Sequence, residues 1–237
     1  MKILALDSSG LVASVAVVED EKLLAEYTVN YKKTHSQTLL PMLDEIGRMI
    51  ELDLSTVDAI AVAAGPGSFT GLRIGSATAK GLGFALDKPL ISVPTVDALA
   101  YNLYGTDKLV CPIMDARRSQ VYTGIYEFDD RRLVVRVPQM AIGVKELADM
   151  INEMGRELIF LGDGVPVYQD ELQALLKVPF HFAPAHLNKQ RAGAVAALAE
   201  LYWLDGKTET AEEHQPDYLR LSQAERERAE AERQKTC

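Results

Sequence analysis

The sequence predicts an α/β protein built from two similar halves that face each other across a cleft. Both halves show the same order of predicted elements, namely three strands, a helix, a strand and a helix. An aspartate ends the first strand of each half, at Asp7 and at Asp115. A pair of glycines follows the fourth strand of each half: Gly65 with Gly67, and Gly162 with Gly164. A repeat of this length indicates duplicated domains, and such strand ends are where α/β sheets bind ligands.

In the first half, the segments MKILALDSS, VASVAVVED and KLLAEYTVN predict three short strands, because apolar and polar residues alternate along them. After a helix, the continuous apolar run AIAVAA predicts a strand that is buried on both faces. The block GPGSFTGLRIGSATAKGLGFAL predicts a loop and then a helix that Ser68 or Thr70 could cap. The strand PLISVPT and the helix TVDALAYNLY complete this half.

The first predicted helix covers THSQTLLPMLDEIGRMIEL and has one apolar face. This face contains Leu39, Leu43, Ile46 and Ile50. The start of the helix stays open between two positions. Thr34 and Gln37 have capping-box spacing, whereas a start at Thr38 would make Pro41 the third helical residue, where no amide bond is lost.

After Gly105 the pattern repeats. The segments LVCPIMDARR, QVYTGIYEF and RLVVRVPQM predict three strands, and VKELADMINEMG predicts a helix. The strand ELIFLGDG, the helix VYQDELQALL, the strand PFHFAP and the helix NKQRAGAVAALAELYWLDG follow.

These elements predict the domain boundaries. Residues 1–105 form the first subdomain and residues 106–187 a smaller second one, with a helix at about 188–205 that could pack back on the first. Residues 206–221 form a segment that docks on the body, because PDYLR mixes tyrosine and leucine into polar surroundings. Residues 222–237 form a tail with Glu and Arg at helical spacing, which is typical of a solvated helix or a frayed end.

Composition limits the possible partners. The chain has 237 residues, 48% of them hydrophobic, and no apolar run that could span a bilayer. The start MKILALDSS predicts a strand instead of a signal peptide, and Cys111 and Cys237 look unpaired, so we expect a cytoplasmic protein. A net charge of −9 argues against this chain alone holding a nucleic acid. Basic residues gather at Arg117, Arg118, Arg131, Arg132 and Arg136, and we interpret them as a solvated face.

A stripe of small residues marks the second predicted helix. Gly71, Gly75, Ala79 and Gly83 follow one another at i, i+4 steps. Each interior glycine costs about 0.5–1 kcal/mol against alanine, so the stripe indicates that another element packs unusually close. That element is either the sheet of the same subdomain or a helix of a partner, and we favour the partner.

The predicted order of elements resembles that of the actin, hexokinase and Hsp70 superfamily, because three strands, a helix, a strand and a helix occur twice. This duplicated ribonuclease H-like fold is also called ASKHA. Its members hold ATP with aspartate–glycine turns after the first strand of each half. The turn Asp7-Ser8-Ser9 stays permissive, but Asp115-Ala116-Arg117 has an arginine where a small residue is expected. We therefore predict a vestigial nucleotide site at Asp7, Ser8 and Asp115. The loop GPGSFTG lacks the lysine of a phosphate-binding loop.

Metal and peptidase chemistry find little support. None of the four histidines forms an HExxH or HxxxH pair, and His181 and His186 are separated by Pro184. No serine lies in a GxSxG motif, and Cys111 lies in a predicted buried strand.

Several segments together resemble the TsaB (YeaZ) family of bacterial tRNA threonylcarbamoyladenosine (t6A) synthesis. These are MKILALDSS, THSQTLLP, the GPGSFTGLRIG–AKGL block, PLISVPT, DARRSQVY and PDYLR, which span the chain up to about Leu221. The resemblance implies a non-catalytic subunit that pairs with the TsaD-type transferase and a TsaE-type ATPase, and forms a homodimer alone. In that machinery, the transferase modifies N6 of adenosine 37 in tRNAs that read ANN codons, so tRNA is met only through the complex. Thr95 and Leu99 stand where the transferase has metal-binding histidines, so no metal is implied. No membrane partner is expected either.

The resemblance also implies a partner interface on the two helices of the first half. Its predicted residues are Leu39, Leu43, Ile46, Gly71, Leu72, Gly75, Ala79, Leu82 and Gly83. No cofactor is expected, apart from weak or complex-dependent ATP or ADP. The alternative function is an ATP-dependent transferase or hydrolase that uses Asp7 and Asp115 in the cleft.

Overall fold

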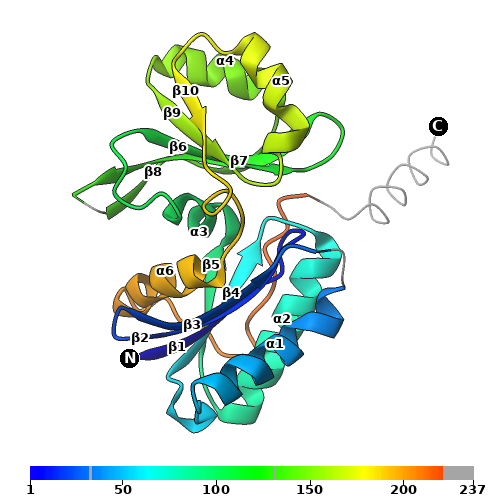
Figure 1. The fold of residues 1–237 in the computed structure, drawn as a ribbon, viewed down its shortest axis with the longest axis vertical. Coiled ribbons are helices and arrows are strands. Elements are labelled where there is room, and N and C mark those ends of the chain that lie inside the picture. Colours follow the sequence, from blue (N-terminus) through cyan, green and yellow to red (C-terminus); the bar gives the residue numbers. More distant parts are fainter. Residues whose placement is uncertain (32–33, 131, 221–237) are drawn as a thin grey trace, which may run out of the picture.

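Two five-stranded sheets of identical strand order form the framework of the protein in the computed structural model, which describes residues 1–31, 34–130 and 132–220 (Figure 1). The first sheet has the order β3 (Lys22–Val29), β2 (Ala13–Glu19), β1 (Lys2–Asp7), β4 (Ala59–Gly65), β5 (Leu90–Pro94). The second has the order β10 (Phe180–Phe182), β9 (Leu158–Leu161), β6 (Leu109–Asp115), β7 (Gln120–Asp129), β8 (Arg132–Gly143). The predicted duplication is confirmed.

The direction of the strands is the same in both sheets. β1 pairs antiparallel with β2 and parallel with β4, and β6 pairs antiparallel with β7 and parallel with β9. The carboxyl ends of the parallel strands therefore lie at one edge of each sheet, which places Asp7 and Asp115 at equivalent positions.

Six α-helices and a short 3-10 helix complete the described part of the chain. Their bounds are α1 (His35–Met49), the 3-10 helix (Leu54–Thr56), α2 (Phe69–Leu86), α3 (Thr95–Tyr101), α4 (Val144–Met154), α5 (Val165–Leu175) and α6 (Ala192–Leu204). α1 and α2 cover one face of the first sheet, and α6 covers the other (Figure 1). α3 packs against α6 and the second sheet, whose outer face carries α4 and α5. No helix within these residues is long and apolar enough to cross a membrane.

Helix α6 is the last helix in sequence within the described residues, and it packs on the first sheet. Its residues Ala192, Val195 and Ala199 are fully buried in the same core as Ala5 and Ala16 of β1 and β2. The helix begins at Ala192, later than the predicted start near residue 188, because residues 188–191 form the connection from the second sheet. In that connection the Asn188 carbonyl accepts a hydrogen bond from the Gly162 amide.

Helix α1 begins at the earlier of the two predicted positions. Thr34 is the residue before the first turn, so Pro41 lies inside the helix. A proline there removes the amide that would bond the Gln37 carbonyl. Both residues are exposed, which leaves that carbonyl open to water. Burial of the apolar face of the helix offsets the cost.

The glycine stripe of α2 faces the first sheet, so the prediction that it faces a partner is wrong. A Cβ atom at Gly71 would lie 2.1 Å from the Ser8 carbonyl oxygen, and one at Gly75 would lie 2.5 Å from the Ser8 hydroxyl oxygen. A Cβ atom at Gly83 would lie 2.5 Å from a methyl carbon of Leu90, and Ala79 is fully buried. The glycines allow α2 to approach strands β1 and β5 closely.

The other predicted interface residues also belong to this core. Leu39, Leu43, Ile46 and Leu72 are buried, and Leu82 is half-buried against the same cluster. A helix buries its most apolar face against its own sheet, so the four buried side chains are not available for a partner. The prediction of the interface is wrong for Leu39, Leu43, Ile46 and Leu72, and for Leu82 it stays a prediction.

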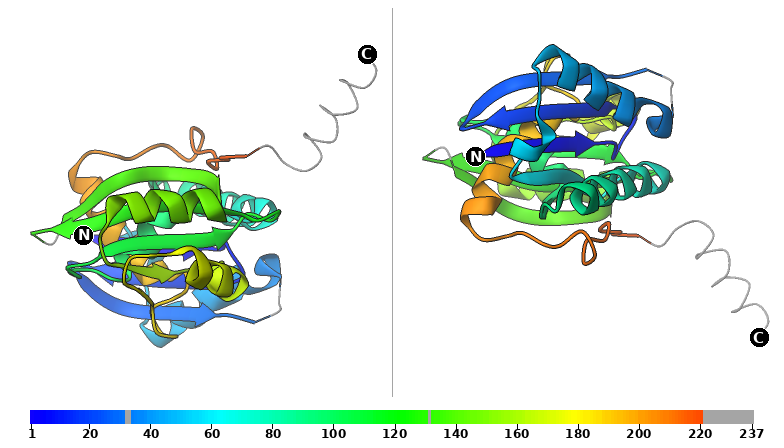
Figure 2. Two further views of the ribbon diagram at one scale, coloured as in Figure 1. Left: turned by 90° about the horizontal axis from the view of Figure 1, so that it is seen from above. Right: turned by 90° about the horizontal axis from the view of Figure 1, so that it is seen from below.

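Residues 208–220, named the strap here, run along the outer flank of α2 (orange to red in Figure 2). At one end, Glu209 forms a two-way backbone bridge with Leu90 at the edge of the first sheet. Further along, the Lys80 ammonium group donates to the carbonyl of His214 at 2.9 Å. At the other end, the Arg220 guanidinium donates to the carbonyl of Ala116 in the second sheet at 2.7 Å. The strap therefore joins both subdomains. The predicted charged tail, residues 222–237, lies outside the described residues.

Candidate functional site

The strand ends around Asp7 and Asp115 are the first candidate site. The backbone after β1 packs against the first turn of α2: the Ser68 amide donates to the Ser9 carbonyl at 2.6 Å. The Ser8 hydroxyl donates to the Gly71 carbonyl at 2.9 Å. A Cβ at Gly67 would lie 2.2 Å from the Ser9 carbonyl oxygen, so this loop leaves no space beside the turn. The chain itself therefore occupies the polar groups that a phosphate-binding turn would offer.

Asp7 lies at the centre of this turn and is almost completely buried. Its carboxylate accepts hydrogen bonds from the amide and the hydroxyl of Ser9, at 2.9 and 2.6 Å. Burial raises the pKa of Asp7 to about 6, although the Ser9 bonds lower it, and the charge of Asp163 raises it further. A carboxylate that binds Mg²⁺ must be ionised, and burial opposes ionisation here.

The equivalent turn of the second sheet is more open. Asp115 accepts hydrogen bonds from the Arg117 amide at 2.8 Å and from the Tyr168 hydroxyl at 2.9 Å. Arg117, Arg118 and Ser119 are exposed, and the Ala116 amide closes the turn by donating to the Gln120 carbonyl. The Asp115 carboxylate orders the turn that presents the two arginines.

This turn holds three consecutive non-glycine residues in the left-handed region. The φ angles of Arg117, Arg118 and Ser119 are 66°, 57° and 54°. L-residues pay about 1–2 kcal/mol each for that conformation. We expect Ser119→Gly to raise the free energy of unfolding by a few tenths to about 1 kcal/mol, because glycine adopts this φ freely. Urea denaturation checks the prediction, with Ser36→Gly in helix α1 as a control that should lose stability.

One buried residue beside the turn after β1 was missed in the sequence. Gln190 is buried, and neither its amide oxygen nor its amide nitrogen has a hydrogen-bond partner within the described residues. A Cβ at Gly10 would lie 2.7 Å from that nitrogen, and His35 bonds the Gly10 carbonyl at 2.8 Å. Gln190 falls in a stretch predicted to be helical, so no sequence signal distinguished it. His35, by contrast, lies in the segment THSQTLLP, which already stood out in the sequence.

Asp163 was also missed, although it lies between the predicted glycines 162 and 164. Its carboxylate accepts a hydrogen bond from the Asp115 amide at 3.3 Å. Burial raises the pKa of Asp163, and the nearby Lys189 opposes this shift. Within the described residues, no three His, Cys, Asp or Glu side chains lie close enough together to hold a metal ion. The ring of His181 instead bonds Glu157, at 2.9 Å.

A second polar cluster lies under the strap and has the composition of a hydrolase triad. Ser92, Glu209 and His214 bond one another, and the Nδ1 atom of His214 is 2.9 Å from both Ser92 Oγ and Glu209 Oε1. In a working triad, the serine and the acid bond opposite ring nitrogens. Here both bond the same nitrogen, and His214 is 1% exposed. The cluster therefore anchors the strap and lacks the geometry of a nucleophile.

The cysteine of β6 is equally unsuited to nucleophilic chemistry. Cys111 is fully buried, as predicted. Burial raises the pKa of its thiol to about 12. The thiolate, which is the reactive form, is therefore strongly disfavoured at neutral pH.

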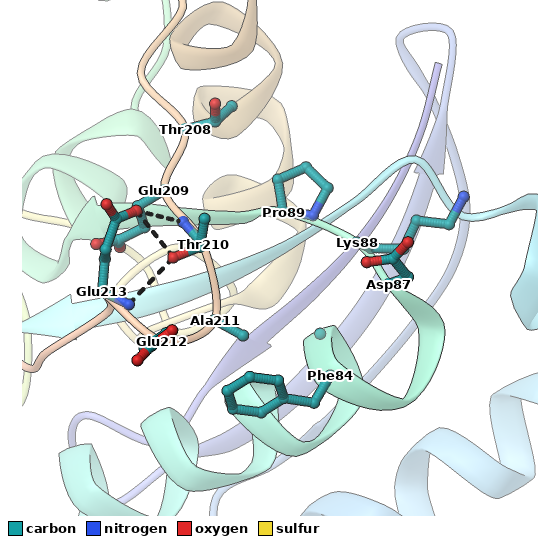
Figure 3. Close-up of a pocket in the computed structure, with 11 residues that line it drawn as sticks. Phe84, Asp87, Lys88, Pro89, Thr208, Glu209, Thr210, Ala211, Glu212 and Glu213 are labelled. Atoms are coloured by element: carbon teal, nitrogen blue, oxygen red, sulfur yellow. Dashed lines mark hydrogen bonds between the residues drawn. The ribbon is translucent and has the colours of Figure 1, made fainter.

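A groove of about 460 Å³ lies between the end of α2 and the start of the strap (Figure 3). Phe84 and Pro89 supply its apolar wall, and residues 208–213 form the opposite side. Its acidic side chains are engaged locally: Glu213 accepts from the amide and the hydroxyl of Thr210, and Glu209 belongs to the anchor cluster. We assign this groove a structural role in holding the strap.

The two sheets of one strand order, each with an aspartate after its first strand, define a protein of the actin, hexokinase and Hsp70 fold class. A polyphosphate/ATP-glucomannokinase from Arthrobacter shares this fold at a TM-score of 0.50 and 14% identity, with 86% of this chain and 99% of that chain covered. A family model described as "TsaD: tRNA N6-adenosine threonylcarbamoyltransferase" matches residues 22–228.

Closer relatives narrow this class. The tRNA threonylcarbamoyladenosine biosynthesis protein TsaB of Bacillus subtilis is 34% identical over 95% of this chain and 96% of its own length. The YeaZ structure from Pseudomonas aeruginosa has a TM-score of 0.80 at 29% identity, with 92% of this chain and 99% of that chain covered. The chain belongs to the TsaB (YeaZ) family, which confirms the resemblance in the sequence.

Proposed function

We propose that this chain is a non-catalytic subunit of the t6A machinery. It pairs with a TsaD-type transferase and works with a TsaE-type ATPase in the cytoplasm, so that adenosine 37 of tRNAs reading ANN codons is modified. One observation carries the non-catalytic part: the turn after β1 is filled by the first turn of α2, with Gly71 against the Ser8 carbonyl. The printed name of the Bacillus subtilis relative supports the pathway.

The partner surface we propose is the outward face of α1 and α2. The inward stripe of α2 is buried, but Ala77, Gly81 and Ala85 are exposed at i, i+4 steps on the other side. No atom lies within 4 Å of a Cβ placed at Gly81. Phe84 beside this outward stripe is 65% exposed, and Leu40 of α1 is 55% exposed. Small residues flanked by large apolar ones fit the close approach of a second helix.

This surface gives the test of the proposal. Gly81→Leu is expected to keep or raise the melting temperature, because leucine favours the helix and meets no neighbour. The same change should abolish co-purification with the TsaD-type partner and shift the homodimer to monomer, because a leucine side chain separates the apposed helices. Pull-down and light scattering measure both effects.

The matched control is Ala174→Leu, an exposed position on α5 of the other subdomain. It should change neither stability nor association. A stable Gly81→Leu protein that binds its partner with normal affinity would contradict the proposed interface.

A further inference from the structure

Four arginines gather where the strap meets the second sheet. Arg220 of the strap bonds the Ala116 carbonyl, so its guanidinium lies beside Arg117 and Arg118. Arg73 of α2 donates from Nε to the hydroxyl of Tyr218, two residues before Arg220. We name Arg73, Arg117, Arg118 and Arg220 the arginine edge. The predicted basic cluster is thus divided, because Arg132 lies beside the far end of β7 from Arg117 and Arg118, and Arg136 lies beside its middle. Arg131, the fifth member of that cluster, lies outside the described residues.

The arginines of the edge are not paired with the carboxylates near them in the chain: Asp115 bonds the Arg117 amide and Asp217 bonds the Gln139 side chain. Within the described residues, none of the edge's four guanidinium groups forms an ion pair, although Arg136 and Arg156 pair with Glu127, and Arg191 with Glu26. Arg73, Arg117 and Arg118 are exposed. The chain as a whole has a net charge of −9, so the positive charge of the arginine edge is opposite in sign to that of the rest of the protein. The left-handed turn, ordered by Asp115, holds two of the four charges outward.

Aromatic rings lie within the same edge. Phe69 and Tyr218 are stacked, with ring centroids 4.2 Å apart and planes 16° apart. The guanidinium of Arg73 lies 4.4 Å from the centroid of Phe69, and Tyr218 keeps 37% of its surface exposed. Phe69 is half-buried, so Tyr218 is the ring of the pair that solvent reaches. An exposed aromatic ring beside arginines is the chemistry that binds single-stranded or looped nucleic acid, through phosphate contacts and base stacking.

We propose that the arginine edge contacts the phosphate backbone of an RNA. An anionic membrane would share the charge preference, but Leu219, the aliphatic residue between Tyr218 and Arg220, is half-buried and does not offer a side chain for insertion into lipid. The negative charge over the rest of the chain repels RNA, so the contact orients an RNA that is held mainly by the partner. The identification of this RNA as tRNA rests on the proposed function. The proposal that the arginine edge binds a phosphate backbone does not depend on it.

The test uses the complex of this chain with its TsaD-type partner and unmodified tRNA. Arg117→Glu/Arg118→Glu should weaken tRNA binding about tenfold or more, and the slope of log affinity against log salt should fall by about 2. The control Lys22→Glu/Lys177→Glu makes the same charge change at two exposed positions, one at the start of β3 and one between α5 and β10, and should leave the slope unchanged.

A second variant separates binding from folding. Arg117→Gly/Arg118→Gly relieves the left-handed strain, so it should be at least as stable as the wild type and yet lose tRNA affinity. Unchanged affinity in both edge variants, or an equal loss in the lysine control, would overturn the proposal. So would edge-dependent binding to phosphatidylglycerol vesicles with no edge-dependent binding to tRNA.

Failure of the proposed function is detected separately, as the absence of pairing between this chain and the transferase. If the chain does not pair with the transferase, filter binding of tRNA to the chain alone at low salt replaces the assay. Binding that the edge variants lose then supports the arginine edge, and binding that they keep overturns it.

Discussion

Replacing Gly71 by alanine is expected to lower the free energy of unfolding by about 3 kcal/mol or more, or to leave the protein insoluble. The added Cβ would lie 2.1 Å from the backbone oxygen of Ser8. That oxygen cannot move away easily, because the Ser8 hydroxyl bonds the Gly71 carbonyl and the Ser68 amide bonds the Ser9 carbonyl. Thermal and urea denaturation measure the loss.

Gly81→Ala on the same helix is the matched control. No atom lies within 4 Å of its added Cβ, so the variant should gain about 0.5–1 kcal/mol from helix propensity alone. A Gly71→Ala protein as stable as this control would refute the packing of α2 on the turn after β1. If it folded and lost only partner binding, the stripe would face a partner after all.

Asp7→Asn is expected to stabilise the protein by up to about 3 kcal/mol at pH 7.5. The pKa of Asp7 is about 6 in the folded state and 3.8 as its ordinary value, so the folded state binds more protons between these values. Stability conferred by the protonated carboxyl is therefore lost as the pH rises from about 4 to 6. Asparagine carries no charge, so the difference between variant and wild type should vanish near pH 4 in urea denaturation.

Asp53→Asn provides a control of opposite sign. Hydrogen bonds from Ser55 lower the pKa of Asp53, so its contribution is lost as the pH falls instead of as it rises. An Asp7→Asn protein less stable than the wild type at pH 7.5 would show that the ionised carboxylate is favoured in the fold. A stable, partner-bound Asp7→Asn protein that forms no t6A would contradict the non-catalytic role and favour the ATP-dependent alternative.

The order of strands and helices was predictable because it depends on local patterns that both halves repeat. The same local patterns could not assign the glycine stripe. The small residues at Gly71, Gly75 and Gly83 indicate that another element packs close to the helix. Their spacing is the same whether that element is a strand of the same chain or a helix of another. Ala77 and Gly81, on the exposed side of α2, have the same i, i+4 spacing of small residues, so the sequence did not distinguish the exposed stripe from the buried one.

The candidate site was predictable only in part. Asp7 and Asp115 follow from the end of a strand in each half. The left-handed turn at Arg117 and Arg118 could not be predicted, because arginine rarely adopts a positive φ and no glycine marks the position. Gln190 reaches Gly10 from the distant connection before α6, and such long-range contacts leave no periodicity in the chain.

The return of α6 to the first sheet has a consequence for synthesis on the ribosome. The strands of that sheet emerge early, but Ile3, Ala5 and Ala61 keep one apolar face uncovered until Ala192–Leu204 has been translated. The second sheet and its helices, α4 and α5, are encoded without interruption in between and can pack first. Folding of the nascent chain should therefore proceed from the middle outward, with the earliest strands closed last. Pulse proteolysis of stalled nascent chains of increasing length would detect protection of the second sheet before the first.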